Sequence, residues 1–496
     1  MAMDDAPKPH FVLVPLMAQG HMIPMADFAL LLVSRGSRVS LITTPVNARR
    51  LRAVANRGGD NLRLVELSMP CAEFGLPEGC ENVDLVRQPE LFIPFFNCIR
   101  RLEDQLNRYL REQPPAPTCI IADQCMPWTM EVANDLGIPR FVFHCPSCFY
   151  LLCTLRIAEH ELYEKVSDPC EAFFVPGLPQ LPQRIEVNKL KAQRFLDVPD
   201  LDLLRHVQEA DATADGIVLN TCYEFEPWCV DDYRGALGKE VWPVGPVSLI
   251  HKDTGGKVVR GDGSAGVDHS GVSQWLDGRE PGSVLFISFG SIARTLFRQQ
   301  VEIGNALEAT GRPFLWAMKE AEKGDLVEEW LAEFEERNRG NGIIVKGWVP
   351  QVLILTHPAV GCFMTHCGWN STLEAVAAGV PMVTWPHFAD QFLNEKLVVD
   401  ILRTGVSVGV KAPFFYMAAG DDALVKSEAV ERAVESIMGG VEGEKIRRRA
   451  RKFAEKASKV MEEGGSSKDN LDRMIDYTIN LATGNYKANG RATALC

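Results

Sequence analysis

The sequence lacks the short motifs that identify several common classes of nucleotide-dependent and metal-dependent enzyme. No G-x-G-x-x-G follows the first apolar run and no G-x-x-x-x-G-K-[ST] occurs, which argues against a dinucleotide oxidoreductase and against a P-loop nucleotidase. No H-E-x-x-H and no other cluster with the spacing of metal ligands is present. We therefore expect no metal site.

Positive charge and long apolar runs are also scarce. The formal net charge is −13, so the chain as a whole does not attract a nucleic-acid backbone, and no nucleic-acid partner is expected. The first apolar run, 11–17, is too short for a signal peptide or a membrane span, and Cys496 is not placed for prenylation. These features predict a cytoplasmic protein without integral membrane association.

The 14 cysteines show no disulfide or zinc framework. They are scattered through apolar segments, as reduced and buried thiols are. Cys145 and Cys148 make one C-x-x-C, but no second pair and no histidine at zinc spacing accompanies them. A place in the core is therefore favoured over a metal or redox role.

The length of 496 residues suggests two large domains, because domains of about 150 residues are typical and a single core does not grow efficiently to this size. Short apolar runs alternate with helical patterns in both halves, which predicts α/β domains with parallel sheets. Two Rossmann-like doubly wound domains would bind ligands at the carboxyl ends of their strands, in a cleft between them. The runs expected to be strands are 11–15, 39–43, 119–122, 140–143, 217–220, 283–289, 314–318, 343–345, 360–364, 380–385 and 406–410.

A segment rich in Gly, Asp and Lys separates the two series of apolar runs. Its composition and its lack of periodicity are typical of an exposed, flexible connection. We therefore expect an N-terminal domain over 1–250, a linker over 251–272, a C-terminal domain over 273–470, and a C-terminal helix and tail over 471–496.

The segment 348–391 is the most informative for function. Within it, an apolar strand ends in T-H-C-G-W-N-S (365–371) and passes directly into a helical pattern. The N-terminus of a helix presents free N–H groups and a partial positive charge, so it binds an anion without a net basic charge. Taken alone, Ser371 to Glu374 also fits a capping box and Asp390 also fits an N-cap, so a purely structural role is equally compatible.

Over its whole length this segment resembles the signature box of the plant secondary-product UDP-glycosyltransferases. W-V-P-Q, H-C-G-W-N-S-T-L-E and P-H-F-A-D-Q stand in register from the first position to the last. The resemblance implies a GT-B fold, with the UDP-sugar in the C-terminal domain, the acceptor mostly in the N-terminal domain, and no bound cofactor. It extends along the rest of the chain, including Gln19-Gly20-His21, Asp123 and Ser288-Phe289-Gly290-Ser291.

The resemblance assigns the donor-binding residues position by position. Trp348 would stack on the uracil, and Gln351 and Glu374 would hold the ribose hydroxyls. The rest of the donor set would comprise His366, Asn370, Ser371 and Ser291 at the diphosphate, Trp369, Asp390 and Gln391 at the sugar, and Val349 and Gly368 in the wall.

His21 is the expected general base and Asp123 its partner. His21 precedes Pro24, so it should lie at a helix N-terminus, where the dipole favours a neutral imidazole. Asp123 ends a predicted strand of the same sheet and would hydrogen-bond the far ring nitrogen. The pair would remove the proton of an acceptor hydroxyl as its oxygen attacks the anomeric carbon with inversion, and no Mg²⁺ would be required.

Gln391 favours glucose as the transferred sugar, because similar enzymes with Gln at this position mostly use UDP-glucose. Three other functions fit the sequence less well. A sugar-nucleotide epimerase would need the absent nicotinamide fingerprint, and a glycosidase would need two identifiable carboxylates. A non-catalytic nucleotide-sugar sensor would have no need of His21 and Asp123.

The sequence does not name the acceptor, and a flavonoid, phenolic, terpenoid or steroid would each suit an apolar pocket. A monomer is expected. The residues expected to line the acceptor pocket are Met17, Phe92, Phe95, Met126, Phe143, His144, Phe149 and His387, together with Phe414 and Phe415.

Overall fold

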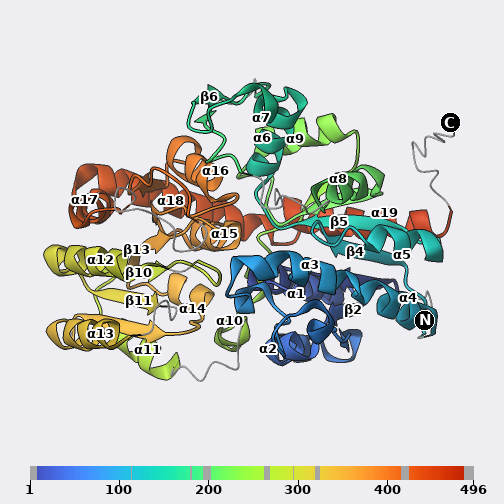
Figure 1. Cartoon of the computed structure of the whole chain (residues 1–496), viewed down its shortest axis with the longest axis horizontal. Helices are drawn as coiled ribbons and strands as arrows, with labels where there is room; N and C mark the ends of the chain where they lie inside the picture. The colour runs from blue at the N-terminus through green and yellow to red at the C-terminus, as the bar shows by residue number, and fades with distance from the viewer. Residues whose placement is uncertain are drawn as a thin grey trace.

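The computed structural model describes residues 8–484, except for 113, 179–180, 182, 194–202, 262–268, 294, 319–323 and 415–423. Two parallel β-sheets flanked by helices occupy the two halves of the molecule (Figure 1). The expectation of two doubly wound α/β units is therefore confirmed. None of the helices in these ranges is both long enough and apolar enough to cross a membrane.

The N-terminal sheet has seven strands in the order β3-β2-β1-β4-β5-β8-β9. Central strands such as β1 and β4 are buried at every residue, which explains why they appear in the sequence as unbroken apolar runs. We expected the run 217–220 to be the last clear strand of this half, but β9 follows it and is only three residues long. The strands are β1 His10–Val14, β2 Arg38–Thr43, β3 Leu62–Glu66, β4 Cys119–Asp123, β5 Arg140–His144, β8 Gly216–Leu219 and β9 Val241–Pro243.

The C-terminal sheet has six strands in the order β12-β11-β10-β13-β14-β15. Each of its six expected apolar runs falls on a strand. A separate antiparallel pair, β6 Phe173–Phe174 and β7 Glu186–Val187, lies outside both sheets. The six strands are β10 Val284–Ser288, β11 Phe314–Met318, β12 Gly342–Lys346, β13 Val360–Thr365, β14 Met382–Thr384 and β15 Gly405–Ser407.

Helices connect the parallel strands, as parallel pairing requires. Those of the N-terminal half are α1 Gln19–Ser34, α2 Pro45–Ala55, α3 Phe92–Arg100, α4 Leu102–Glu112, α5 Thr129–Leu136, α6 Cys148–Glu159, α7 Leu162–Lys165, α8 Leu203–Thr213 and α9 Pro227–Leu237. Those that follow are α10 Thr254–Val259, α11 His269–Asp277, α12 Phe297–Thr310, α13 Asp325–Arg337, α14 Gln351–Leu355, α15 Trp369–Ala378, α16 Gln391–Lys396, α17 Ser427–Met438, α18 Gly440–Val460 and α19 Ser466–Ala482.

The last helix, α19, returns to the N-terminal half of the molecule. It lies beside the N-terminal sheet in Figure 1 and packs against β9. Leu471, Met474 and Ile475 are buried in the same apolar cluster as strands β1 and β4. The end of the chain therefore ties the two halves together, because a helix that follows the C-terminal sheet completes the core of the N-terminal one.

The segment expected to be an exposed linker is ordered and partly buried where the structure describes it. It forms the helix α10, and Arg260 is only 7% exposed. The expectation of exposure therefore holds for 252–255 but is wrong for Arg260, whose guanidinium is buried between carboxylates from both halves. Residues 262–268 lie outside the described ranges.

The order of the strands places the two ligand-binding edges. Each sheet reverses its direction of winding between two neighbouring strands, β1 and β4 in one and β10 and β13 in the other. Val14 pairs with Ala122, and Ser288 pairs with Thr365, so the loops after these strands lie side by side. Such reversal points form the crevices in which open α/β sheets bind ligands.

Candidate active site

A cleft of about 460 Å³ lies between the two sheets at these reversal points. Its wall contains His21 from the N-terminal half and the N-terminus of α15 from the C-terminal half. All twelve residues expected to bind the donor line this one cleft: Ser291, Trp348, Val349, Gln351, His366, Gly368, Trp369, Asn370, Ser371, Glu374, Asp390 and Gln391.

His21 and Asp123 form a hydrogen-bonded pair at the edge of the N-terminal sheet. His21 is the third residue of α1, and Asp123 is the last residue of β4. Nδ1–H of His21 donates to Oδ2 of Asp123 over 2.7 Å. Because a carboxylate only accepts, this bond places the proton on Nδ1 and leaves the Nε2 lone pair available.

The carboxylate of Asp123 is held from three directions. Its Oδ1 accepts a hydrogen bond from the backbone N–H of Cys125 at 2.9 Å. Its Oδ2 also accepts one from the thiol of Cys145 at 3.4 Å. Burial raises the pKa of Asp123, but His21 and these hydrogen bonds lower it by more than burial raises it. The net shift of the pKa is downward. Asp123 is therefore a fixed anion that orients the imidazole.

The pKa of His21 differs from the sequence-based expectation. Burial lowers this pKa, but the charge of Asp123, its hydrogen bond and the charge of Asp390 raise it, and the net shift is upward. We had expected the helix dipole to favour the neutral ring. The two carboxylates outweigh that effect, so His21 is a stronger base than a free histidine and holds its proton to a higher pH.

The same corner of the cleft is the place where a metal ion would find ligands. Atoms of His21, Asp123 and Cys125 all lie within 4.8 Å of one another. Two of these groups already share a proton, and burial raises the pKa of the Cys125 thiol well above its usual range. The described geometry is that of a hydrogen-bonded acid–base pair, and a metal would have to displace protons from it.

The opposite wall is built to receive an anion. Helix α15 begins at Trp369 after Gly368, and residues 368–371 all line the cleft, so the N-terminus of this helix lies at the cleft wall. Beside it, the His366 ring lies between Gly290 and Gly368, where an added Cβ would approach the ring to 2.6 and 2.5 Å. Burial lowers the pKa of His366 to about 4, and its Nδ1 has no hydrogen-bond partner among the described residues. A neutral imidazole on the cleft wall carries one ring N–H that can donate to a ligand oxygen.

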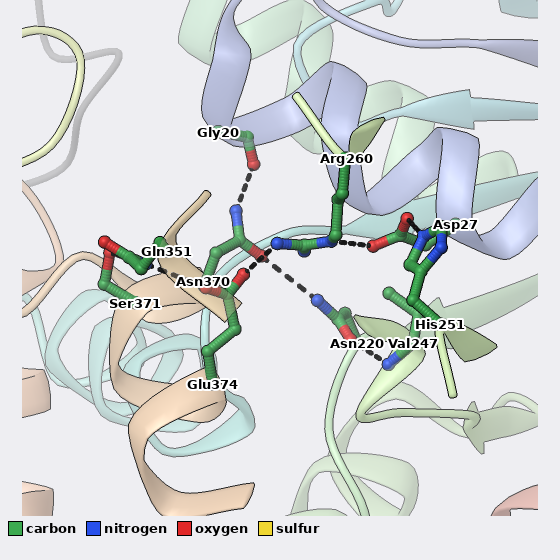
Figure 2. Close-up of polar contacts among 10 residues, drawn as sticks. All are labelled: Gly20, Asp27, Asn220, Val247, His251, Arg260, Gln351, Asn370, Ser371 and Glu374. Atoms are coloured by element: carbon green, nitrogen blue, oxygen red, sulfur yellow. Dashed lines mark hydrogen bonds and ion pairs between the residues drawn. The ribbon is translucent and has the colours of Figure 1, made fainter. Parts of the chain in front are cut away.

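Two residues at the start of α15 also join the halves of the molecule. The side-chain amide of Asn370 donates to the Gly20 carbonyl and accepts from Nδ2 of Asn220 at 3.1 Å (Figure 2). The indole N–H of Trp369 donates to the Asn220 carbonyl over 2.7 Å. The indole N–H of Trp369 is therefore already used, and the assignment of this residue to the sugar hydroxyls stays a prediction.

Glu374, one turn further along α15, does not form a capping box. Its Oε2 accepts from Nε2 of Gln351 at 2.8 Å, and the same nitrogen lies 3.0 Å from Oγ of Ser371. Its Oε1 lies 2.6 Å from Nη1 of Arg260. These contacts, drawn in Figure 2, show that Glu374 faces a polar network at the cleft and does not turn back to the helix N-terminus.

Asp390 and Gln391 also line the cleft, at the start of α16. Asp390 is the N-cap residue of α16, but its side chain makes no capping bond and instead accepts from Asn394 at 2.7 Å. Burial raises the pKa of Asp390 to about 6. Oε1 of Gln391 accepts from the backbone N–H groups of His387 and Phe388, at 2.8 and 3.1 Å. The amide nitrogen of Gln391 is therefore the group left for a ligand.

Comparison with known proteins agrees with this geometry. A family model described as UDP-glucoronosyl and UDP-glucosyl transferase matches residues 273–421, and one described as glycosyltransferase, N-terminal domain, matches 10–249. UDP-glycosyltransferase 73C13 of Barbarea vulgaris is 43% identical over 489 residues, covering 96% of this chain and 97% of that protein. The chain is a member of the UDP-glycosyltransferase family. UDP-glycosyltransferase 73C3 of Arabidopsis thaliana is also 43% identical, over 491 residues with the same coverage.

Solved structures place this glycosyltransferase in the GT-B fold. UGT73P12 of Glycyrrhiza uralensis, complexed with glycyrrhetinic acid 3-O-monoglucuronide, superposes with a TM-score of 0.87 at 33% identity, covering 96% of this chain and 97% of that one. UGT2 of Phytolacca americana, complexed with UDP-2fluoro-glucose and pterostilbene, gives 0.72 at 26% identity, with 96% and 100% covered. The GT-B fold expected from the signature box is confirmed.

The residues expected in the acceptor pocket of this glycosyltransferase do not line the cleft. Phe143 packs on Phe28 with ring centroids 5.3 Å apart, and His387 packs on Phe414 at 4.4 Å. His144 makes a hydrogen bond to the side chain of Gln124, which itself lines the cleft. Phe415 lies outside the described ranges. The members that are core residues, at most 8% exposed, are Met17, Phe92, Phe95, Met126, Phe143, His144, Phe149 and His387.

Several cleft residues of the enzyme were not expected from the sequence. Gln124 directly follows Asp123 at a strand end, which is a position that could have indicated it. Lys257 and Arg260 lie in the segment that resembled an exposed linker. The cleft residues in this group are Gln19, Gly20, Ile23, Gln124, Pro146, Tyr150, Lys257, Arg260, Ile292 and Phe388.

Proposed function

We propose that this enzyme is an inverting O-glucosyltransferase that transfers glucose from UDP-glucose to a hydroxyl group of a small lipophilic molecule. The observation that carries the proposal is the position of His21. Its Nδ1 is held by Asp123, and the residue lines the same cleft as the N-terminus of α15. A base on one wall thus faces an anion site on the other.

In the proposed reaction, Nε2 of His21 takes the hydroxyl proton of the acceptor while the acceptor oxygen forms a bond to the anomeric carbon. The bond between that carbon and the β-phosphate oxygen breaks, and its electron pair leaves with UDP. Attack and departure take place on opposite faces, so the configuration inverts. Asp123 stabilises the imidazolium that forms.

We propose that the leaving diphosphate is stabilised without a metal ion. The N-terminus of α15 supplies free N–H groups, and His366 and Ser371 line the cleft beside it. Trp348 would stack on the uracil, and Gln351 and Glu374 would accept or donate to the ribose hydroxyls. This donor site needs only local dipoles, which suits a chain whose net charge is −13.

Glucose is the proposed sugar because Asp390 and Gln391 offer complementary groups on the cleft wall. Asp390 accepts hydrogen bonds, whereas Gln391 offers the N–H groups of its amide, since its oxygen is used by the backbone. Equatorial hydroxyls of glucose would pair with both. Galactose turns one hydroxyl axial and would leave a buried polar group unpaired.

The acceptor would bind beside His21. Ile23, Pro146, Tyr150 and Phe388 line the same cleft as His21 and supply apolar surface, and Gln124 adds a polar group. The structural relatives bound to pterostilbene and to glycyrrhetinic acid 3-O-monoglucuronide support a phenolic or terpenoid acceptor. Among the aglycone classes, flavonoid, phenolic, terpenoid and steroid hydroxyls all fit this description.

We also propose that the enzyme works as a monomer in the cytoplasm. Every described cysteine is a free thiol, and all except Cys170 are buried, which suits a reducing compartment. Gel filtration with light scattering tests the oligomeric state.

The experiment that tests the function is incubation with UDP-glucose and a panel containing one acceptor of each class. Mass spectrometry should show addition of a single hexose to at least one acceptor, and the anomeric proton coupling in NMR should show a β-linkage. An α-linked product would contradict the inverting mechanism. Hydrolysis of UDP-glucose with no transfer to any acceptor would contradict a transferase role for this site.

A further inference from the structure

Arg260 joins the helix that carries the base to the helix that carries the donor site. It follows α10, in the segment between the two sheets, and only 7% of its surface is exposed. Its Nε donates to Oδ2 of Asp27 over 2.7 Å, and its Nη1 lies 2.6 Å from Oε1 of Glu374. Asp27 belongs to α1, and Glu374 belongs to α15. Figure 2 shows the guanidinium lying between the two carboxylates.

The Asp27 end of this bridge is rigid. Both carboxylate oxygens are used, because Oδ1 lies 2.6 Å from Nε2 of His251 while Oδ2 accepts from Arg260. All three side chains are at most 7% exposed. Burial raises the pKa of Asp27, but Arg260 and His251 lower it by more than burial raises it. The net shift is downward, so the carboxylate is an anion. Arg260 is therefore anchored to α1 before any ligand arrives.

The Glu374 end of the bridge leaves room for a ligand. Oε1 receives one bond from Arg260, and Oε2 receives one from Gln351. Each carboxylate oxygen can accept two hydrogen bonds, so one position on each oxygen remains. Two remaining positions match the two neighbouring hydroxyls of a ribose.

The backbone next to Arg260 also contacts the expected uracil site. An added Cβ at Gly261, whose φ is +102°, would lie 2.0 Å from Cζ2 of Trp348. Only glycine allows so close an approach to the indole ring. The segment 260–261 therefore contacts Glu374 and Trp348, the residues assigned to the ribose and to the base of the nucleotide.

We propose that Arg260 is a positioning residue for ribose recognition, which holds the Glu374 carboxylate in the orientation that accepts both ribose hydroxyls. This inference rests on the proposed function, because it requires the nucleotide of a UDP-sugar at Glu374. Arg260 touches the carboxylate and acts through it. Because Arg260 is also bound to Asp27, it fixes the position of Glu374 relative to α1, the helix that carries His21.

The test compares the binding of UDP and 2′-deoxy-UDP by isothermal titration calorimetry. The wild-type protein is expected to bind UDP about 10- to 100-fold more tightly, since a hydrogen bond from the 2′-hydroxyl to a charged acceptor is lost in the analogue. In Arg260→Met and Arg260→Lys the ratio should fall below about threefold, because neither side chain can bridge both carboxylates. A melting curve confirms that each variant is folded, and the Lys variant keeps the charge if Arg260→Met fails to fold.

Arg312→Met is the matched control. Arg312 makes two bonds to Glu435, at 2.7 and 2.8 Å, and neither residue lines the cleft. This variant should lower the melting temperature without changing the ratio for the two nucleotides. If wild-type protein binds UDP more tightly than 2′-deoxy-UDP and Arg260→Lys shows the same ratio, the inference about Arg260 is overturned and the proposed function is not. Wild-type protein that does not bind UDP would overturn the proposed function as well.

Discussion

Nδ1 of His21 lies 2.7 Å from Oδ2 of Asp123 at the carboxyl edge of two adjacent strands. The Asp123 side chain is fully buried, whereas His21 lines the cleft. Val14 and Ala122 are paired in the sheet, so the residues that follow β1 and those that end β4 must meet at that edge. Asp123 therefore acts only through the imidazole, because no ligand in the cleft can reach its carboxylate.

Asp123→Asn should lower transfer by about 10²- to 10⁴-fold while leaving the fold intact. An amide can present its N–H₂ to the histidine, which favours the tautomer with the proton on the wrong nitrogen. Steady-state kinetics with circular dichroism as the control for folding measures this. Asp135, an exposed residue whose carboxylate accepts from Asn107, offers a comparison, and Asp135→Asn should retain normal turnover.

The pH dependence of kcat/KM should show a steep acid limb. The pKa of His21 is raised above its ordinary value, so at low pH the ring is protonated and cannot accept the hydroxyl proton. Asp390, with its pKa raised to about 6, becomes neutral below that pH and loses its charge in the cleft. We expect activity to rise with pH through both transitions and to level off above them.

Asp390→Asn separates the two groups. This change removes one titration, so the slope of log kcat/KM against pH in the acid limb should fall from about two towards one. An acid limb with the same steep slope in this variant would show that Asp390 does not contribute.

Removal of divalent metal should leave the rate unchanged. The diphosphate is expected to be stabilised by the α15 N-terminus and by neutral His366, whose pKa is lowered to about 4 by burial. Assays after dialysis against EDTA, with and without added Mg²⁺, measure this. A loss of activity that Mg²⁺ restores would contradict stabilisation by local dipoles.

Donor choice should depend on Gln391. With its oxygen used by the backbone of His387 and Phe388, the amide can offer only N–H donors to the sugar. Loss of a hydrogen-bonding partner in a buried site costs about 1 to 3 kcal/mol, so kcat/KM for UDP-glucose should exceed that for UDP-galactose by at least about tenfold. Gln391→His should narrow this difference. Equal use of both donors by the unmodified enzyme would show that Gln391 does not discriminate.

That the expected donor residues share one cleft could be predicted from the sequence, because all of them except Ser291 come from the continuous stretch 348–391. A strand, a turn and a helix N-terminus follow each other between 360 and 378, so the local pattern alone places His366 and Ser371 at one edge. The same reasoning placed His21 at a helix N-terminus after the first strand and Asp123 at the end of a strand of the same sheet. It could not give the direction of the pKa shift of His21, because that direction depends on whether the charge and hydrogen bond of Asp123, with a smaller contribution from Asp390, outweigh the effect of burial.

The acceptor wall could not be predicted in the same way. Strands that are buried on both faces appear as unbroken apolar runs, so the sequence does not show which side chains turn towards a cleft. Phe143 and Phe149 satisfied the expected composition but belong to the core. Arg260 was missed for the opposite reason, since a Gly-rich, polar segment indicates exposure and gives no sign of a buried ion pair.

The central claim is that His21 is the general base of glucose transfer, and the kinetics of His21→Ala test it most directly. Transfer from UDP-glucose should fall by about 10²- to 10⁴-fold, while calorimetric binding of UDP stays within about threefold of wild type. His160→Ala, at an exposed histidine beyond the cleft, should change neither value. Near-normal turnover of His21→Ala, with UDP binding intact, would contradict the account.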